Sequence, residues 1–184
     1  MHLLSFAFLM GCWFAWFYPF IFRAPHNQKR PSVTLTAQTR LGLLLECAGI
    51  FIGFVCRAEF SDPGPVRMAG SALLGLAAPL LSWSAVKHLG RQFRITAGLY
   101  DDHRLVRTGA YSIVRHPIYA SLLAILGSTL FLLTDWRWAI LSLALFIAGT
   151  EIRVRAEDGL LRSRFGEEFQ AYRRGVKAYI PFVR

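Results

Sequence analysis

Arg115, His116 and Tyr119 stand within five positions of one another, at the start of a long apolar run. An arginine can hold a carboxylate through paired N–H donors, and a histidine can change its charge near neutral pH. A tyrosine offers both a hydroxyl group and an aromatic face. Such a group at the mouth of an apolar segment suits a reaction in which a water-soluble molecule meets a lipid-soluble one.

A second polar cluster follows another apolar run. Its members are Glu151, Arg153, Arg155, Glu157 and Asp158. Taken singly, each residue of the two clusters has a structural explanation. Arginines gather at the cytosolic face of membrane proteins, tyrosines anchor helices at the interface, and acids pair with neighbouring bases. The joint occurrence of these residues in this order favours a functional site.

The elements that carry these clusters are predicted from the distribution of apolar residues, which make up 54% of the 184-residue chain. They fall into runs of about the ~20 residues that a helix needs to cross a bilayer. The runs are 3–22, 41–60, 68–86, 117–134 and 136–154. Because backbone groups must pair within the segment in lipid, helices are expected. We predict an all-α polytopic membrane bundle of about five transmembrane helices, forming one domain over residues 1–184. Residues 134–137 read as a short turn, so the last two helices are expected to form an antiparallel hairpin. The two polar clusters at the cytosolic ends of that hairpin are then expected to lie close together.

The basic residues predict the orientation of this bundle. With five spans, 18 of the 21 Lys and Arg residues lie on one side of the membrane and three lie on the other. The positive-inside rule then puts the N-terminus outside and the C-terminus in the cytosol of a multi-pass membrane protein. The net charge of +10 therefore indicates topology and attraction to membrane lipids, and no nucleic-acid partner is expected. A signal peptide is the alternative for residues 3–22, although they lack a basic leading region.

The residues after Glu151 predict an amphipathic helix on the cytosolic side. Leu161, Phe165, Phe169 and Tyr172 recur at spacings of three and four residues, which defines one helical face. This helix either lies on the membrane surface or forms one wall of an active site. An interior glycine, at position 166, weakens it by roughly 1 kcal/mol.

Glu46 is an ionisable residue inside a predicted span, and such residues are functional candidates by default. It also stands near the cytosolic end of its span, so reaching the membrane interface is the alternative. Gly49 and Gly53 in the same helix form a pattern that permits close helix packing. The cysteines at positions 12, 47 and 56 lie in apolar runs and give no metal-ligand spacing, so buried thiols and no metal site are expected.

Two segments together resemble the isoprenylcysteine carboxyl methyltransferase family. They are "LVRTGAYSIVRHPIYAS" and, some thirty residues later, "RVRAEDGLLRSRFGEEFQAYRRGVKAYIPF". The family pattern combines Arg-His-Pro-x-Tyr with Arg-x-x-x-Glu-Glu and Phe-Gly-x-x-Tyr-x-x-Tyr. The resemblance covers about residues 90–182. It implies scaffold helices in 1–86 and a methyltransferase core in 87–184 that binds S-adenosylmethionine with its C-terminal helices and loops.

The resemblance also implies roles for particular residues. The cofactor-binding set would be Leu105, Gly109, Tyr111, His116, Tyr119, Glu157 and Asp158, with Leu105 and Gly109 contributing backbone. Arg115, with Arg153 or Arg155, would lie nearest the acceptor as the catalytic set. The chain departs from the pattern at Ser121 for Gly, Asp158 for Glu, Ala110 for Pro and Phe169 for Tyr.

Several functions remain open from the sequence. The first is methyl transfer to a lipophilic carboxylate such as that of an isoprenylcysteine. The acceptor could instead be a phospholipid amine, a small amine or a thiol, and an amine would require a general base. A membrane-embedded NADPH-dependent reductase is another alternative, because sterol reductases have a similar helical C-terminal half. The last is a non-enzymatic membrane scaffold.

Overall fold

The structure is a computed structural model that describes residues 3–22, 37–58, 63–90 and 104–183. Its elements are α1 (Leu3–Phe22), α2 (Ala37–Val55), α3 (Gly64–Leu89), η2 (Gly109–Ser112), α4 (Pro117–Leu133) and α5 (Trp136–Gly175). Within these residues β pairing is limited to two isolated bridges, so the expected all-α class is confirmed there. Residues 23–36, which follow the first predicted helix, and residues 91–103, which follow the third, lie outside the described residues.

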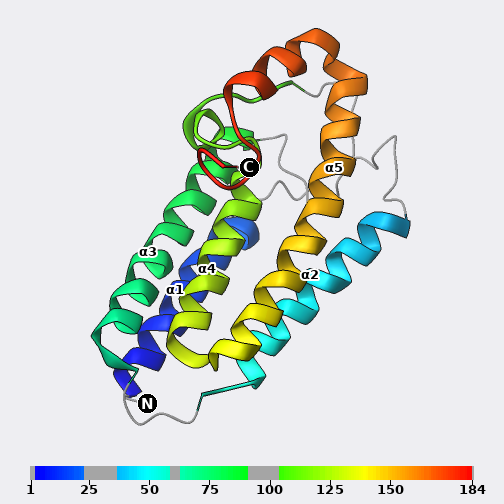
Figure 1. Cartoon of the computed structure of the whole chain (residues 1–184). Coiled ribbons are helices and arrows are strands. Elements are labelled where there is room, and N and C mark those ends of the chain that lie inside the picture. Colours follow the sequence, from blue (N-terminus) through cyan, green and yellow to red (C-terminus); the bar gives the residue numbers. More distant parts are fainter. Residues whose placement is uncertain (1–2, 23–36, 59–62, 91–103, 184) are drawn as a thin grey trace.

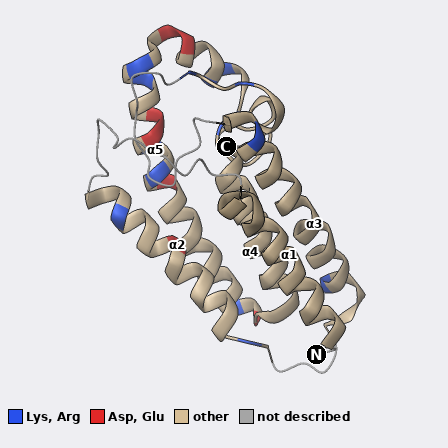
Figure 2. Ribbon diagram, turned by 180° about the vertical axis from the view of Figure 1, so that it is seen from behind, with Lys and Arg blue, Asp and Glu red and all other residues tan. Residues whose placement is uncertain are grey.

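Helices α1, α2 and α3 are long and apolar enough to cross a membrane, and α4 is a shorter apolar helix of 17 residues. Large apolar side chains face outward along them; Phe14, Leu73 and Leu80 are about 70% exposed. Soluble proteins rarely expose so much apolar surface to water, whereas the acyl chains of a bilayer would cover it. Figure 2 shows the charged residues gathered mainly along the outer part of α5 and near the C-terminal end. The chain is therefore a membrane protein.

Helices α1, α3 and α4 form one packed group (Figure 1). Buried polar side chains join them, because polar groups surrounded by apolar side chains must find partners. The indole N–H of Trp13 donates to Thr129 Oγ1 at 3.0 Å, and that of Trp16 donates to Ser121 Oγ at 2.9 Å. The N-terminal helix is thus bonded directly to the helix that follows the Arg-His-Pro segment.

Helix α2 packs on α5 through a stripe of small residues. Its buried positions are Thr39, Gly42, Glu46, Gly49 and Gly53, which repeat every three or four residues. A Cβ on Gly49 would meet the Ser142 backbone oxygen at 2.6 Å, so only glycine fits there. The close packing predicted from Gly49 and Gly53 is confirmed, and its partner is α5.

The prediction that α4 and α5 pack as a close hairpin is wrong in one respect. The two helices are joined by a short turn at Thr134 and Asp135, as expected, but they touch each other little. Helix α4 lies mainly against α3, and α5 lies mainly against α2. The small residues of α2 offer α5 a closer surface than the bulkier α4 does.

Helix α5 is also longer than predicted. The expected span 136–154 and the expected amphipathic helix are one continuous helix up to Phe165. At 1.5 Å per residue this part is about 45 Å long, which exceeds the ~30 Å of a bilayer core. At Gly166 the backbone is non-helical (φ 50°, ψ −123°), and the chain turns back over the end of the bundle, as Figure 1 shows. Gly166 is therefore a bend that suits glycine, and it does more than weaken a helix.

Candidate active site

The segment that enters α4 is held in place by the C-terminal part of the chain. The backbone N–H groups of Arg115 and His116 donate to the carbonyls of Lys177 and Ala178 at 2.8 and 2.7 Å. Pro117 then begins α4, where its missing N–H would have no helical partner. This pairing fixes two consecutive polar side chains at the mouth of the helix.

Asp158 on α5 binds both of those side chains. Its Oδ2 accepts from Arg115 Nη2 at 2.9 Å, and its Oδ1 lies 2.8 Å from His116 Nε2. The Arg115 and His116 side chains are only 3% and 6% exposed. Arg115 Nη1 also donates to the Val176 carbonyl. The two polar clusters therefore meet, as predicted. Long side chains bridge the space between α4 and α5, although the two helices do not pack closely.

Glu157 extends the cluster toward the bundle. Its Oε1 accepts from the Tyr119 hydroxyl at 2.5 Å, and its Oε2 lies 3.3 Å from His116 Nδ1. Each carboxylate of the Glu-Asp pair therefore contacts one nitrogen of the same imidazole. His116 is held between two acids, and Tyr119 is tied to the nearer of them.

These contacts shift the pKa of three titratable groups. Burial opposes ionisation of Asp158, but the hydrogen bond and charge of His116 and the charge of Arg115 lower the pKa of that carboxyl below its usual value. Burial likewise opposes ionisation of Glu157, and its contacts with His116 and Tyr119 lower the pKa. Burial acts against a charged His116, yet the two carboxylates raise the pKa of the imidazole. These shifts favour the ionised form of both carboxyl groups and the charged form of the imidazole.

The short helix η2 precedes Arg115 and His116 and packs between α3 and the returning part of α5. Gly109 has φ 63°, and a Cβ at this position would overlap the His88 imidazole. Tyr111 is buried, and its carbonyl accepts from the Tyr172 hydroxyl at 2.5 Å. Burial raises the pKa of Tyr172 to about 12, so this hydroxyl keeps its proton. Tyr172 and the fully buried Phe169 lie beyond the Gly166 bend, so the returning part of α5 packs against the site rather than lying free on a membrane surface.

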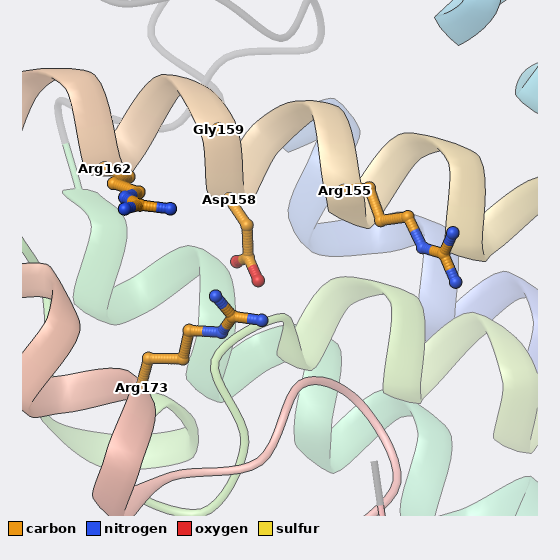
Figure 3. A pocket seen from close by; sticks show the side chains of 5 residues that line it. All are labelled: Arg155, Asp158, Gly159, Arg162 and Arg173. Carbon is orange, nitrogen blue, oxygen red and sulfur yellow. The ribbon is translucent and has the colours of Figure 1, made fainter.

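A cavity of about 400 Å³ opens beside Asp158. It is lined by Arg155, Asp158, Gly159, Arg162 and Arg173. Figure 3 shows Arg162 and Arg173 reaching toward Asp158 from the two parts of α5, while Arg155 points away. Among the described residues, no acid lies within salt-bridge distance of Arg162 or Arg173. The cavity therefore offers two unpaired guanidinium groups next to a carboxylate.

The three predicted catalytic arginines lie in different environments. Arg115 is buried in the cluster, and its Nε is a buried donor with no partner within the described part of the chain. Arg153 is 18% exposed and bonds Glu46 at 2.6 Å. Arg155 is mostly exposed and bonds Glu151 at 3.1 Å. Of the predicted cofactor-binding residues, Leu105 is half-buried in the segment before η2, and the others belong to the cluster or to η2.

A family model for the isoprenylcysteine carboxyl methyltransferase (ICMT) family matches residues 71–163, half of the chain. The chain belongs to this family. The matched range contains α4, η2, both polar clusters and the part of α5 that carries Asp158, and it begins after α1 and α2. The resemblance read from the two sequence segments is confirmed.

Curated relatives carry corresponding names. A "Probable protein-S-isoprenylcysteine O-methyltransferase" of Oryza sativa subsp. indica is 29% identical over 102 residues, which cover 54% of this chain and 53% of that protein. The "Protein-S-isoprenylcysteine O-methyltransferase" of Schizosaccharomyces pombe is 32% identical over 103 residues, 54% of this chain and 43% of that protein. The chain spans about half the length of the curated relatives it matches.

Departures from the family pattern have structural partners in this chain. Ser121, where glycine is usual, accepts the indole N–H of Trp16. Ala110, where proline is common, donates its backbone N–H to Ser84 Oγ at 3.0 Å, which proline could not do. Asp158, where glutamate is usual, reaches both Arg115 and His116. In this chain the departures are compatible with the cluster of Arg115, His116, Glu157 and Asp158.

Two sets of contacts near the site were not predicted from the sequence. The backbone of residues 176–178 positions Arg115 and His116, and no periodic pattern marks this segment. Glu46 is 1% exposed and bonds Arg153, so the interpretation that it reaches the membrane interface is wrong. The presence of an acid in a predicted span was the available signal, but it did not identify the partner.

Proposed function

We propose that the chain is an integral membrane methyltransferase that moves a methyl group from S-adenosylmethionine to a lipophilic acceptor, the carboxylate of an isoprenylcysteine-like group. The observation that carries the proposal is the junction of Arg115 and His116 with Glu157 and Asp158 at one end of the bundle, in a chain of the ICMT family. The names of the rice and fission yeast relatives support the same reaction.

The proposal includes five membrane crossings, with the N-terminus outside and the site on the cytosolic side. The N-terminal part of α1 and the C-terminal segment lie at opposite ends of the bundle (Figure 1), as an odd number of crossings requires. The excess of Lys and Arg at the end that holds the site supports its cytosolic location. A water-soluble cofactor would then reach the cluster directly.

The charges around the cavity fit the amino-acid part of the cofactor. That part is a zwitterion, with an ammonium and a carboxylate on one carbon. Asp158 could attract the ammonium, while Arg162 and Arg173 could bind the carboxylate through charge-assisted hydrogen bonds. Together with the unpaired Nε of Arg115, this set of donors and acceptors supports S-adenosylmethionine as the cofactor. Tyr119 adds an aromatic face beside the cluster, which would favour a sulfonium by about 1 kcal/mol.

The contacts within the cluster favour an acceptor that is already ionised. When bound, S-adenosylmethionine supplies an activated methyl group and a neutral leaving group, so no general acid is needed. The lowered pKa of Glu157 makes that carboxylate a weak general base, and both ring nitrogens of His116 already contact carboxylates. An amine would have to lose a proton first, whereas a carboxylate would not. The remaining task of the chain is to hold both reactants in line, which can supply about 7–11 kcal/mol.

Transfer of a labelled methyl group tests the proposal. Membranes containing the chain are incubated with S-adenosyl-L-[methyl-³H]methionine and N-acetyl-S-farnesylcysteine, and base-labile methyl ester is measured. We expect labelled ester with the native chain and little with Glu157→Gln. The exposed Glu167→Gln, on the returning part of the tail, is the matched control and should retain activity.

Cofactor binding in detergent separates this proposal from its alternatives. S-adenosylhomocysteine should raise the melting temperature, and NADPH should not. A response to NADPH alone would favour a reductase, and a response to neither ligand would favour a scaffold. A labelled lipid amine without labelled ester in membrane extracts would show that the carboxylate acceptor is wrong.

A further inference from the structure

Glu46 is the one acid among the described residues of α1, α2 and α3, and it is 1% exposed. It lies outside residues 71–163, the range that the ICMT family model matches. A carboxylate buried in a membrane-crossing helix is costly unless it is paired. The groups that pair with Glu46 therefore indicate what the residue does.

Both oxygens of Glu46 bind residues of α5. Thr150 Oγ1 donates to Oε1 at 3.0 Å, and Arg153 Nη1 donates to Oε2 at 2.6 Å. Glycines make room for these bonds. A Cβ on Gly42 would overlap the Arg153 side chain, and a Cβ on Gly149 would overlap the backbone of Gly42 and Glu46. The small residues of α2 and α5 thus let Glu46 reach the guanidinium group of Arg153.

The other face of Arg153 meets the active-site cluster. Its guanidinium carbon lies 5.1 Å from the centroid of the Tyr119 ring, and the Tyr119 hydroxyl donates to Glu157 at 2.5 Å. Within the described part of the chain, Nε and Nη2 of Arg153 make no hydrogen bond, and the side chain is 18% exposed. Arg153 is therefore held on one side and retains free donors on the other.

We propose that Glu46 is a positioning residue: it fixes the Arg153 guanidinium against Tyr119 so that the free N–H groups bind the acceptor carboxylate. This inference rests on the proposed methyl transfer. Without the charge of Glu46, Arg153 is free to turn toward Glu157, the carboxylate that Tyr119 and His116 bind. The acceptor then loses its partner while the cavity beside Asp158 stays intact.

The test separates acceptor binding from cofactor binding. Glu46→Gln keeps the shape of the side chain and removes its charge. We expect the KM for N-acetyl-S-farnesylcysteine to rise about tenfold, the effect of losing one charge-assisted hydrogen bond. The Kd for S-adenosylhomocysteine, measured by calorimetry in detergent, should change less than about twofold. Glu46→Asp keeps the charge, so its KM should lie between that of Glu46→Gln and that of the native chain.

A double-variant cycle tests whether Glu46 acts through Arg153. In an Arg153→Gln background, Glu46→Gln should cause no further rise in KM, because the group that it positions is gone. The same double variant should melt at a higher temperature than Arg153→Gln alone, because it no longer buries an unpaired carboxylate. A merely structural role predicts that stability and KM change together.

The outcomes distinguish this inference from the proposed function. If native chain binds S-adenosylhomocysteine and methylates the probe, but Glu46→Gln has a native KM, the inference is wrong and the proposed function stands. An equal rise in KM on adding Glu46→Gln to the native chain and to the Arg153→Gln chain would also overturn it. If the native chain neither binds the cofactor product nor methylates the probe, the proposed function itself fails.

Discussion

Replacing Asp158 by asparagine should destabilise the chain far more than breaking an ion pair on its surface. Asp158 is the acid shared by Arg115 and His116, whose side chains are 3% and 6% exposed. Asp158→Asn keeps the size of the side chain and leaves two buried cations without their shared carboxylate. Removing one partner of a buried pair costs about 3–5 kcal/mol. The exposed pair of Glu168 with Arg107 is the matched control, because pairs of that kind contribute about 0–1 kcal/mol.

For a chain of this size, 1 kcal/mol corresponds to about 2–4 °C in Tm. We therefore expect Asp158→Asn to melt roughly 10 °C below the native chain, and Glu168→Gln to melt within about 4 °C of it. The assay can use Cys12, which is buried in the bundle, as the reporter for a thiol-reactive dye. The exposed Cys47 and the half-buried Cys56 are first replaced by alanine to remove background.

Equal shifts for the two variants would refute the reasoning, because they would mean that Asp158 is no more desolvated than a surface acid. An unchanged Tm for Asp158→Asn would do the same. Both measurements are made without cofactor, so that the cavity beside Asp158 does not contribute ligand binding to the difference.

Three further predictions concern the same end of the bundle. Folding raises the pKa of His116 above 6.5, so the contribution of this group to stability is complete below pH 6.5 and is lost as the pH rises through the folded pKa. We therefore expect Tm to fall toward pH 9, and we expect His116→Gln to reduce this dependence of Tm on pH in the same melting assay. Gly109→Ala should lower Tm because its Cβ overlaps His88 at a positive φ, and adding His88→Ala should recover the steric part of the loss. Gly166→Ala should cost about 1–3 kcal/mol at its bend and raise the Kd for S-adenosylhomocysteine, whereas Gly11→Ala, in open space on α1, should be neutral or stabilising.

The sequence predicted those features that local chemistry determines. The charge-free run 3–22 became α1 with the same ends, because lipid leaves a helix as the way to pair its backbone. Pro117 marked the first turn of α4, where proline is favoured. The two polar clusters were predicted to meet, and Asp158 does bind Arg115 and His116.

Features that depend on distant contacts were not predictable in this way. Adjacent helices were expected to pack together, but the choice of α2 as the partner of α5 depends on which surfaces fit most closely. Gly166 was read as a weak point of a helix because composition does not give the backbone angles that make it a bend. The charge of Glu46 within an apolar run marked it as a candidate in the sequence. Its partner, Arg153, lies 107 residues away and is identified only by the packing of α2 on α5.

The hydrogen bonds from Arg115 and His116 to the backbone of Lys177 and Ala178 have a consequence for the order in which the molecule forms. Val176, which accepts from the Arg115 side chain, follows that arginine by 61 residues. While the chain is being synthesised, α1 to α4 can enter the bilayer one after another, each satisfied by its own helical bonds. The polar cluster has to wait until the ribosome has delivered α5 and the residues beyond it. Nascent chains halted between residues 154 and 176 would hold every apolar run and still lack the backbone partners that orient the arginine and the imidazole.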